Sequence, residues 1–134
     1  MTIRRERISR KELRAFTQRT DEHVEHGNKW VFTRADLSSN ARLILWQIIN
    51  LSHGEPCWAR REYFVDFFNL GMKQVRRALR QLVATGYIER HWGPRRNRER
   101  VRLTYVTEKV PWAVLLSKGI KRRFLPPGER TRHE

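Results

Sequence analysis

The sequence predicts a mainly α-helical domain with a small β-hairpin, because three patterns follow one another in a fixed order. Apolar residues at helical spacing mark three successive helices between residues 38 and 84. The tripeptide Asn69-Leu70-Gly71 separates the second of these helices from the third. After the third helix, two runs of alternating apolar and polar residues flank a Gly-Pro turn, which is typical of a hairpin. With 134 residues, the chain has room for one such domain and its tails.

An additional helix is predicted at the N-terminal side, over residues 10–26. Ser9 and Glu12 have the spacing of a capping box, in which the serine hydroxyl accepts an orphan backbone N–H. We expect Gly27-Asn28 to end this helix and residues 29–33 to form a short extended segment. The residues before Ser9 are basic, and we expect them to be mobile.

The first two of the three successive helices have clear boundary signals. The first is predicted to begin after Ser38, a residue type that caps helix N-termini, and to end near Ser52. The second is predicted over residues 60–68. In the break that follows, Asn69 or Gly71 can adopt a positive φ angle, and Gly71 can also serve as the next N-cap.

The third helix is predicted to run from Met72 to Ala84 and to have two different faces. Gly86 follows at the position where glycine commonly ends a helix. The helix contains no acidic residue, so ordinary ion pairing between successive turns cannot explain its basic residues. The outward residues are Lys73, Gln74, Arg76, Arg77, Arg80 and Gln81, and the inward residues are Val75, Ala78, Leu79 and Leu82.

The hairpin is predicted from residues 87–91 and 100–105, with a long turn over residues 92–99. Six arginines lie between Arg90 and Arg102, and they are accompanied by a single acidic residue. This excess is greater than solubility requires, so we expect the turn to contact phosphate or the minor groove of a nucleic acid. The turn residues in question are Arg95, Arg96 and Arg98.

Beyond the hairpin, Val110-Pro111 is predicted to open a short apolar segment, Trp112–Leu116, with a proline where a helix start tolerates one. We expect the Pro-rich tail beyond Leu125 to be disordered. The predicted organisation is therefore a basic N-terminal arm and helix (residues 1–35), the central domain (residues 36–108), and a short apolar segment with a basic tail (residues 109–134).

The charge of the chain points to a polyanionic partner. Twenty-nine Lys and Arg residues against 14 Asp and Glu residues give a net charge of +15 and a pI near 11.4. A positive field of this strength concentrates polyanions, and nucleic acid is the partner that it predicts. Anionic lipid is the alternative, but no apolar stretch is long enough to span a bilayer, and no apolar run follows the N-terminal arginines as in a signal peptide. We therefore expect no membrane association.

The residue types of catalysis and metal binding do not occur in the required patterns. His23, His26, His53 and His91 do not form the tight ligand pairs of a zinc site. The sequence also lacks a Gly-rich phosphate loop, a nucleophile elbow and an isolated carboxylate pair. We expect no enzymatic activity, no metal and no cofactor. Cys57, the single cysteine, is predicted to be a buried small apolar residue, and a chain without an intramolecular disulfide fits the reducing cytoplasm, or the nucleoid if the source is bacterial.

The stretch from Leu37 to about Thr107 resembles the winged helix-turn-helix family of bacterial, phage and plasmid regulators and replication proteins. One departure concerns the turn, where family members usually have Gly-Val-Ser and this chain has Asn69-Leu70-Gly71. The missing serine removes a side-chain cap from the next helix. The residues that carry the resemblance are Leu37-Ser38-Ser39-Asn40-Ala41-Arg42, Cys57-Trp58, Val75-Arg76-Arg77-Ala78-Leu79-Arg80-Gln81-Leu82 and Gly86-Tyr87-Ile88-Glu89-Arg90.

The resemblance implies a winged helix-turn-helix with an extra N-terminal helix, mainly α with a small β-wing, which binds double-stranded DNA. It also implies that Arg80 meets phosphate. Arginine can make bidentate contacts with guanine and glutamine with adenine, so a helix of this composition suits the major groove. The residues that the resemblance places nearest the bases are Lys73, Gln74, Arg76 and Arg77.

Three roles remain open at this point. The first is sequence-biased duplex binding by a transcriptional regulator. The second is a role in plasmid or phage DNA replication, in which the domain binds a replication origin. The third is a protein-interaction scaffold whose cationic face binds an acidic partner. Phe67 and the segment Trp112–Leu116 are hard to bury in one small core, so a homodimer also remains open.

Overall fold

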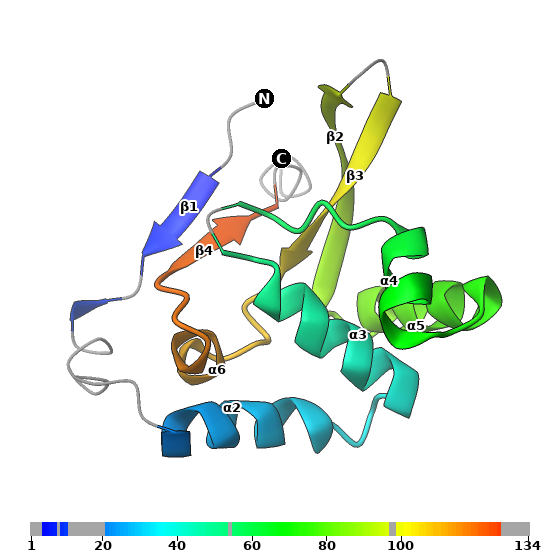
Figure 1. The fold of residues 1–134 in the computed structure, drawn as a ribbon. Helices are drawn as coiled ribbons and strands as arrows, with labels where there is room; N and C mark the ends of the chain where they lie inside the picture. Colours follow the sequence, from blue (N-terminus) through cyan, green and yellow to red (C-terminus); the bar gives the residue numbers. More distant parts are fainter. Residues whose placement is uncertain (1–3, 8, 11–20, 54, 97–98, 127–134) are drawn as a thin grey trace.

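The computed structural model of the protein describes residues 4–7, 9–10, 21–53, 55–96 and 99–126, and Figure 1 shows its fold. Five helices and four strands lie within these residues. In chain order they are β1 (Arg4–Arg7), α2 (Asp21–Phe32), α3 (Ser39–Asn50), α4 (Arg61–Phe68), α5 (Met72–Ala84), β2 (Ile88–Arg96), β3 (Glu99–Val106), α6 (Trp112–Ser117) and β4 (Arg122–Leu125).

The predicted fold class is confirmed: the described chain is mainly helical, and an antiparallel hairpin of β2 and β3 follows α5. The hairpin projects away from the helices as a wing (Figure 1). Helices α3 and α4 both pack against α5. The cap predicted for α3 is present, because the Ser38 hydroxyl accepts a hydrogen bond from the Ala41 N–H at 3.2 Å.

A continuous apolar core joins the three helices to the base of the wing. The inward stripe of α5 is buried throughout, as its spacing predicted. Phe64 is the buried residue of α4, and it is 1% exposed. Burial of these faces fixes α5 in orientation and leaves its opposite face to solvent. The core residues of α3 and α5 are Ala41, Ile44, Leu45, Ile48, Ile49, Val75, Ala78, Leu79 and Leu82.

The expected end of the N-terminal helix at Gly27-Asn28 is wrong, because α2 continues to Phe32 and includes most of the segment expected to be extended. Gly27 is buried where α2 crosses α6, and a Cβ on it would lie 1.9 Å from the Ser117 Oγ. Asn28 accepts hydrogen bonds from the Trp46 indole N–H, at 2.9 Å, and from the Lys118 ammonium. Both residues therefore serve helix packing. Glu12 of the expected capping box, with residues 11–20, lies outside the described residues.

The expectation of a mobile N-terminal arm is also wrong for residues 4–7, because β1 pairs antiparallel with β4. On β4, Arg123 is 4% exposed, and its guanidinium donates to the backbone carbonyls of Thr107 and Val110 at 2.9 and 2.6 Å. Phe124 packs with Leu103 and Tyr105 of β3. Part of the basic C-terminal segment is thus structural. Of the tail expected to be disordered beyond Leu125, Pro126 is buried in the structure, and residues 127–134 lie outside the described residues.

The apolar segment expected to be hard to bury forms α6 and packs against α2. Val114, Leu115 and Leu116 are each at most 7% exposed. Most of the segment consequently belongs to the core, and Trp112 and Ala113 are partly exposed. Phe67 does remain exposed, by 50%, with its ring stacked on that of Tyr63.

The turn expected over residues 92–99 is wrong in extent, because β2 reaches Arg96 and β3 begins at Glu99. The register is irregular between Trp92 and Arg95, and it then resumes. Pro94 has no N–H to donate to the ladder, which accounts for a local irregularity without ending the strand. Of the brief strand expected near Cys57, a single bridge to Thr104 is present.

Candidate nucleic-acid interface

The turn between α4 and α5 is built as the break in the sequence predicts. Asn69 adopts the left-handed conformation, with φ 54° and ψ 49°, and Gly71 is the N-cap of α5. Glycine offers no side-chain cap, as expected from the missing serine. The Gln74 side chain compensates from within the helix, because its Oε1 accepts the Gly71 N–H at 2.9 Å.

The outward face of α5 exposes four cations: Lys73, Arg76, Arg77 and Arg80. None of them forms an ion pair with another described residue. Gln81 is half-buried, and its Oε1 accepts the Ser38 N–H at 2.9 Å, so it holds the start of α3. The face therefore carries a net charge of +4 that the described protein leaves uncompensated.

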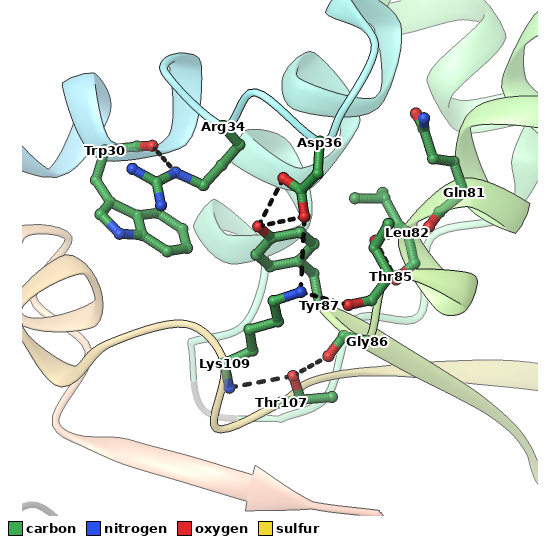
Figure 2. Close-up of polar contacts among 10 residues, drawn as sticks. All are labelled: Trp30, Arg34, Asp36, Gln81, Leu82, Thr85, Gly86, Tyr87, Thr107 and Lys109. Carbon is green, nitrogen blue, oxygen red and sulfur yellow. Dashed lines mark hydrogen bonds and ion pairs between the residues drawn. The ribbon is translucent and has the colours of Figure 1, made fainter.

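A polar junction fixes the C-terminal end of α5, and Figure 2 shows its residues. The Tyr87 hydroxyl donates to the Asp36 carboxylate, at 2.9 and 3.0 Å from its two oxygens. Lys109, from the loop after β3, lies 3.6 Å from the same carboxylate and donates to the Thr85 carbonyl at 2.6 Å. Thr107 donates to the carbonyl of Gly86, which has φ +86°. The junction thereby ties α5 and the base of the wing to the loop before α3.

The charges at this junction support one another. The hydrogen bond from Tyr87 holds the pKa of Asp36 below its ordinary value of 3.8, and Lys109 adds to this effect. Burial, together with the bond to Asp36, raises the pKa of Tyr87 above its ordinary value of 10.0. At neutral pH Asp36 is therefore an ionised carboxylate and Tyr87 is a neutral phenol. Trp30 of α2 packs edge-on against the Tyr87 ring, at 6.1 Å between centroids.

A groove with a volume of about 380 Å³ lies where α5 faces the base of the wing and the start of α4. Leu79, Val83 and Ala84 supply its apolar wall. None of the lining residues is acidic. The polar lining consists of five arginines, Arg61, Arg76, Arg80, Arg90 and Arg102. We call this feature the arginine groove.

Arg90 is the most strongly perturbed group of the arginine groove. Burial lowers its pKa to about 10, and the charges of Arg102 and Arg61 contribute in the same direction. Its Nε donates to the Thr104 hydroxyl at 3.3 Å. The group is still protonated at neutral pH, so the groove keeps its positive charges close together.

A second hollow, of about 180 Å³, continues along the wing from the arginine groove and shares Arg61, Arg90 and Arg102 with it. Trp92 lines this hollow and is 51% exposed. The guanidinium carbons of Arg100 and Arg102 lie 5.0 and 5.3 Å from the centroid of the Trp92 ring. A surface with many arginines, one acidic residue (Glu62) and an exposed aromatic ring thus runs from α5 along one face of the wing.

Residues 35–88 match the family model of a helix-turn-helix domain. This segment is a helix-turn-helix domain. The match confirms the resemblance over α3, α4, α5 and the first residue of β2, and it indicates DNA binding. With the hairpin that follows, the described chain is a winged helix-turn-helix. No curated protein and no solved structure matches the chain.

In a helix-turn-helix domain, the second helix of the motif is the recognition helix, which here is α5. The structure brings four of its five predicted contact residues to one exposed face, as described above. The fifth, Gln74, is also exposed, but its carbonyl oxygen is engaged at the N-cap. In this rotamer the oxygen is held at the N-cap and the two N–H donors of the amide are free for a base, so a contact through the N–H groups needs no change at the cap.

The predicted wing contacts are only partly placed by the structure. Arg95 and Arg96 lie on β2, paired with Arg100 and Glu99, and their side chains lie outside the described part of the chain. Arg98 lies outside the described residues altogether. The assignment of these three arginines to DNA stays a prediction.

Sequence reasoning missed Arg61, Arg90 and Arg102 as site residues. A signal for one of them was present, because Arg102 alternates with the apolar residues Val101 and Leu103 along β3, as on a strand with one basic face. The groove itself requires the hairpin register, in which Arg102 lies opposite Trp92, two positions from Arg90. Arg61 joins the groove from α4, which no local pattern could reveal.

The structure also shows how the described His, Cys, Asp and Glu side chains, the residue types of catalysis and metal binding, are placed. Among them, no three His, Cys, Asp or Glu side chains lie close enough to hold a metal ion. Cys57 is 1% exposed, as predicted, and burial raises the pKa of its thiol. None of the described helices is long and apolar enough to cross a membrane.

Proposed function

We propose that the protein binds double-stranded DNA with a preference for particular sequences, as a regulator of transcription. The observation that carries this proposal is the recognition helix: one face is locked into the core, and the other exposes four cations without a carboxylate partner among the described residues. A helix of this kind fits the major groove, where arginine and lysine read guanine.

Within this proposal, Lys73 and Arg77 reach the base edges. Gln74 approaches a base through its amide N–H groups, because its oxygen is bound to the Gly71 N–H. Arg76 and Arg80 line the arginine groove, so they lie on the side of α5 that faces the wing and contact the DNA backbone. This assignment moves Arg76 from the bases, where the resemblance placed it, toward phosphate.

Selection of bound duplexes from a random pool tests the proposal. We expect one motif to be enriched, and Arg77→Ala to lose about 1–3 kcal/mol of binding free energy on that motif, with little loss on scrambled DNA. Lys121→Ala, an exposed cation before β4, is the control and should leave the ratio of the two affinities unchanged. Equal losses on both duplexes for Arg77→Ala would contradict base reading by α5.

The position of the selected motif in the source genome separates two roles. Motifs near promoters support transcriptional regulation, whereas a cluster of motifs at one replication origin supports the replication role. We also propose that the protein is not an enzyme. The polar side chains of the arginine groove are all guanidinium groups, which keep their protons at neutral pH and cannot act as general bases.

A single copy of the chain is sufficient for binding in this proposal. The burial of α6 leaves Phe67 as the remaining feature that motivated a homodimer, and a single exposed aromatic residue is common on monomers. We therefore expect an asymmetric motif and a monomer in light scattering. A two-fold symmetric motif, with half-sites about 34 Å or a multiple of this distance apart, would show that a dimer binds.

A further inference from the structure

We propose that the arginine groove binds one phosphodiester group of the DNA backbone, between the recognition helix and the wing. The inference rests on the proposed function, and it names the chemical group that the groove accepts. The supporting observations are the charge of the groove, an unpaired buried donor and the apolar wall. The arginines of the groove lie at the base of the wing and on two helices. They are different residues from the arginines predicted to contact DNA at the wing tip.

The arginine groove concentrates positive charge at a cost in free energy. Five guanidinium groups surround about 380 Å³, and no acidic residue lines that volume. The lowered pKa of Arg90 reflects its burial and its repulsion from Arg102 and Arg61. Such a cluster opposes folding of the free protein, and an anion placed among the arginines would reverse the sign of the interaction.

Three arginines outside the groove have hydrogen-bond partners that explain their positions. Arg123 donates to two backbone carbonyls, Arg34 donates to the Trp30 carbonyl, and Arg42 donates to the Arg34 carbonyl. In the groove, the guanidinium of Arg102 lies over the Trp92 ring, but its Nε is buried and has no hydrogen-bond partner among the described residues. A buried donor without an acceptor is costly, and a phosphate oxygen is a strong acceptor for guanidinium groups.

The apolar wall distinguishes a phosphodiester from a free phosphate ion. Leu79, Val83 and Ala84 lie in the same groove as the arginines, and Val83 is 45% exposed although it is apolar. Inorganic phosphate has no apolar part to place there. In DNA, each phosphate is flanked by two deoxyribose groups, whose C–H surfaces can pack against these side chains while the arginines contact the phosphate oxygens.

The first arm of the test measures how DNA affinity depends on salt. Each phosphate contact contributes about 0.9 to the slope of log K against log salt concentration on duplex DNA. We therefore expect Arg102→Gln to flatten the slope by about one unit on a duplex of any sequence. Arg61→Gln, in the first turn of α4, is a second variant in case Arg102→Gln does not fold, as judged by circular dichroism. Arg122→Gln, which replaces an exposed arginine of β4, is the matched control. Its salt slope should stay closer to the wild-type slope than the slopes of the groove variants do.

The second arm uses inorganic phosphate as the probe, in thermal melts at constant ionic strength with phosphate replacing chloride. If the groove accepts a phosphate group, wild type and Arg122→Gln should gain more in Tm than Arg102→Gln or Arg61→Gln. The comparison between variants removes the general stabilising effect of phosphate on proteins.

The two arms give separable outcomes. A flatter salt slope in the groove variants supports the phosphodiester contact, whatever the result of duplex selection. If duplex selection then enriches no motif, the proposed sequence preference is wrong but the backbone contact is still supported. A wild-type slope in both groove variants overturns the inference. A wild-type slope combined with a groove-dependent Tm gain from phosphate also overturns it, because the groove then accepts a free anion and not the DNA backbone.

Discussion

The Asp36 carboxylate is a single side chain that connects three parts of the domain. It lies in the loop before α3, accepts a hydrogen bond from Tyr87 and lies 3.6 Å from the Lys109 ammonium. The segment that matches the helix-turn-helix family spans residues 35–88, so the bond from Tyr87 to Asp36 closes the domain at its two ends. The bond thereby holds the loop before α3 against the base of the wing.

The lowered pKa of Asp36 predicts how the stability of this junction depends on pH. Because the folded-state pKa lies below the ordinary value of 3.8, the carboxylate stabilises the folded protein above that value, and this contribution is lost as the pH falls toward the folded-state pKa. We expect Asp36→Asn to melt below wild type at pH 6, with the gap closing as the pH falls below 3.8. Thermal melts from pH 6 to pH 2 measure the gap.

Tyr87→Phe provides the matching control for this prediction, since it removes the donor and keeps the ring. The double variant should lose less than the sum of the two single variants, because both changes remove the same hydrogen bond. A gap between Asp36→Asn and wild type that stays constant from pH 6 to pH 2 would show that Asp36 does not act through its charge.

Among the helices, α2 differs most from its prediction, and the reason lies far away in the sequence. Glycine is a weak helix former, so Gly27 indicated a helix end. The structure places it inside α2, facing the buried hydroxyl of Ser117 in α6. The glycine is explained by the packing of α2 against α6, in which residues 27 and 117 meet although they are 90 positions apart in the sequence.

This packing makes Gly27→Ala a test of the α2–α6 contact. Alanine would favour the helix by about 1 kcal/mol, but its Cβ would lie 1.9 Å from the Ser117 Oγ and 2.7 Å from the Ser117 Cβ. Overpacking of a buried contact costs about 1–3 kcal/mol, so we expect a net loss in the free energy of unfolding, measured by urea denaturation. Adding Ser117→Gly should restore part of the loss. Glu25→Ala, at an exposed position of α2, is the control, and a stabilised Gly27→Ala would contradict the close contact.

The elements that sequence reasoning predicted well are those with local signals at both ends. Helix α3 has its Ser38 cap, α5 begins after Gly71, and Gly86 has a positive φ angle just beyond α5. The exposed face of α5 followed from its 3.6-residue period. The hairpin was predicted, but its strands extend further than expected, because Gly93-Pro94 was interpreted as a turn and is part of β2.

The arginine groove lay beyond the reach of such signals. Its residues come from α4, α5, β2 and β3, so it exists only when the hairpin register and the packing of α5 are known together. The basic tail shows the converse case, since Arg123 contributes to the same net charge and yet is buried in a structural role. Net charge therefore predicted the class of partner, and the fold was needed to tell the arginines that line the groove from those with a structural role.

At the scale of the whole molecule, the net charge of +15 and the winged fold predict that several separate regions contribute to DNA affinity. The base of the wing contains the arginine groove, and the tip contains Arg95, Arg96 and Arg98. The tip and the groove are separate sets of residues. Their contributions to the salt slope should therefore add, because distant and independent sites behave additively.

Replacing Arg95, Arg96 and Arg98 by alanine tests the tip alone. If each contacts one phosphate, the slope of log K against log salt should flatten by about two to three units. Preferred and scrambled duplexes should weaken by similar factors, since phosphates carry no sequence, whereas Arg77→Ala should change the ratio between them. Fluorescence anisotropy across a salt series measures both quantities, and adding Arg102→Gln should flatten the slope by about one further unit. A triple variant with the wild-type slope would show that the wing tip does not contact DNA, and it would assign the electrostatic part of binding to α5 and the arginine groove.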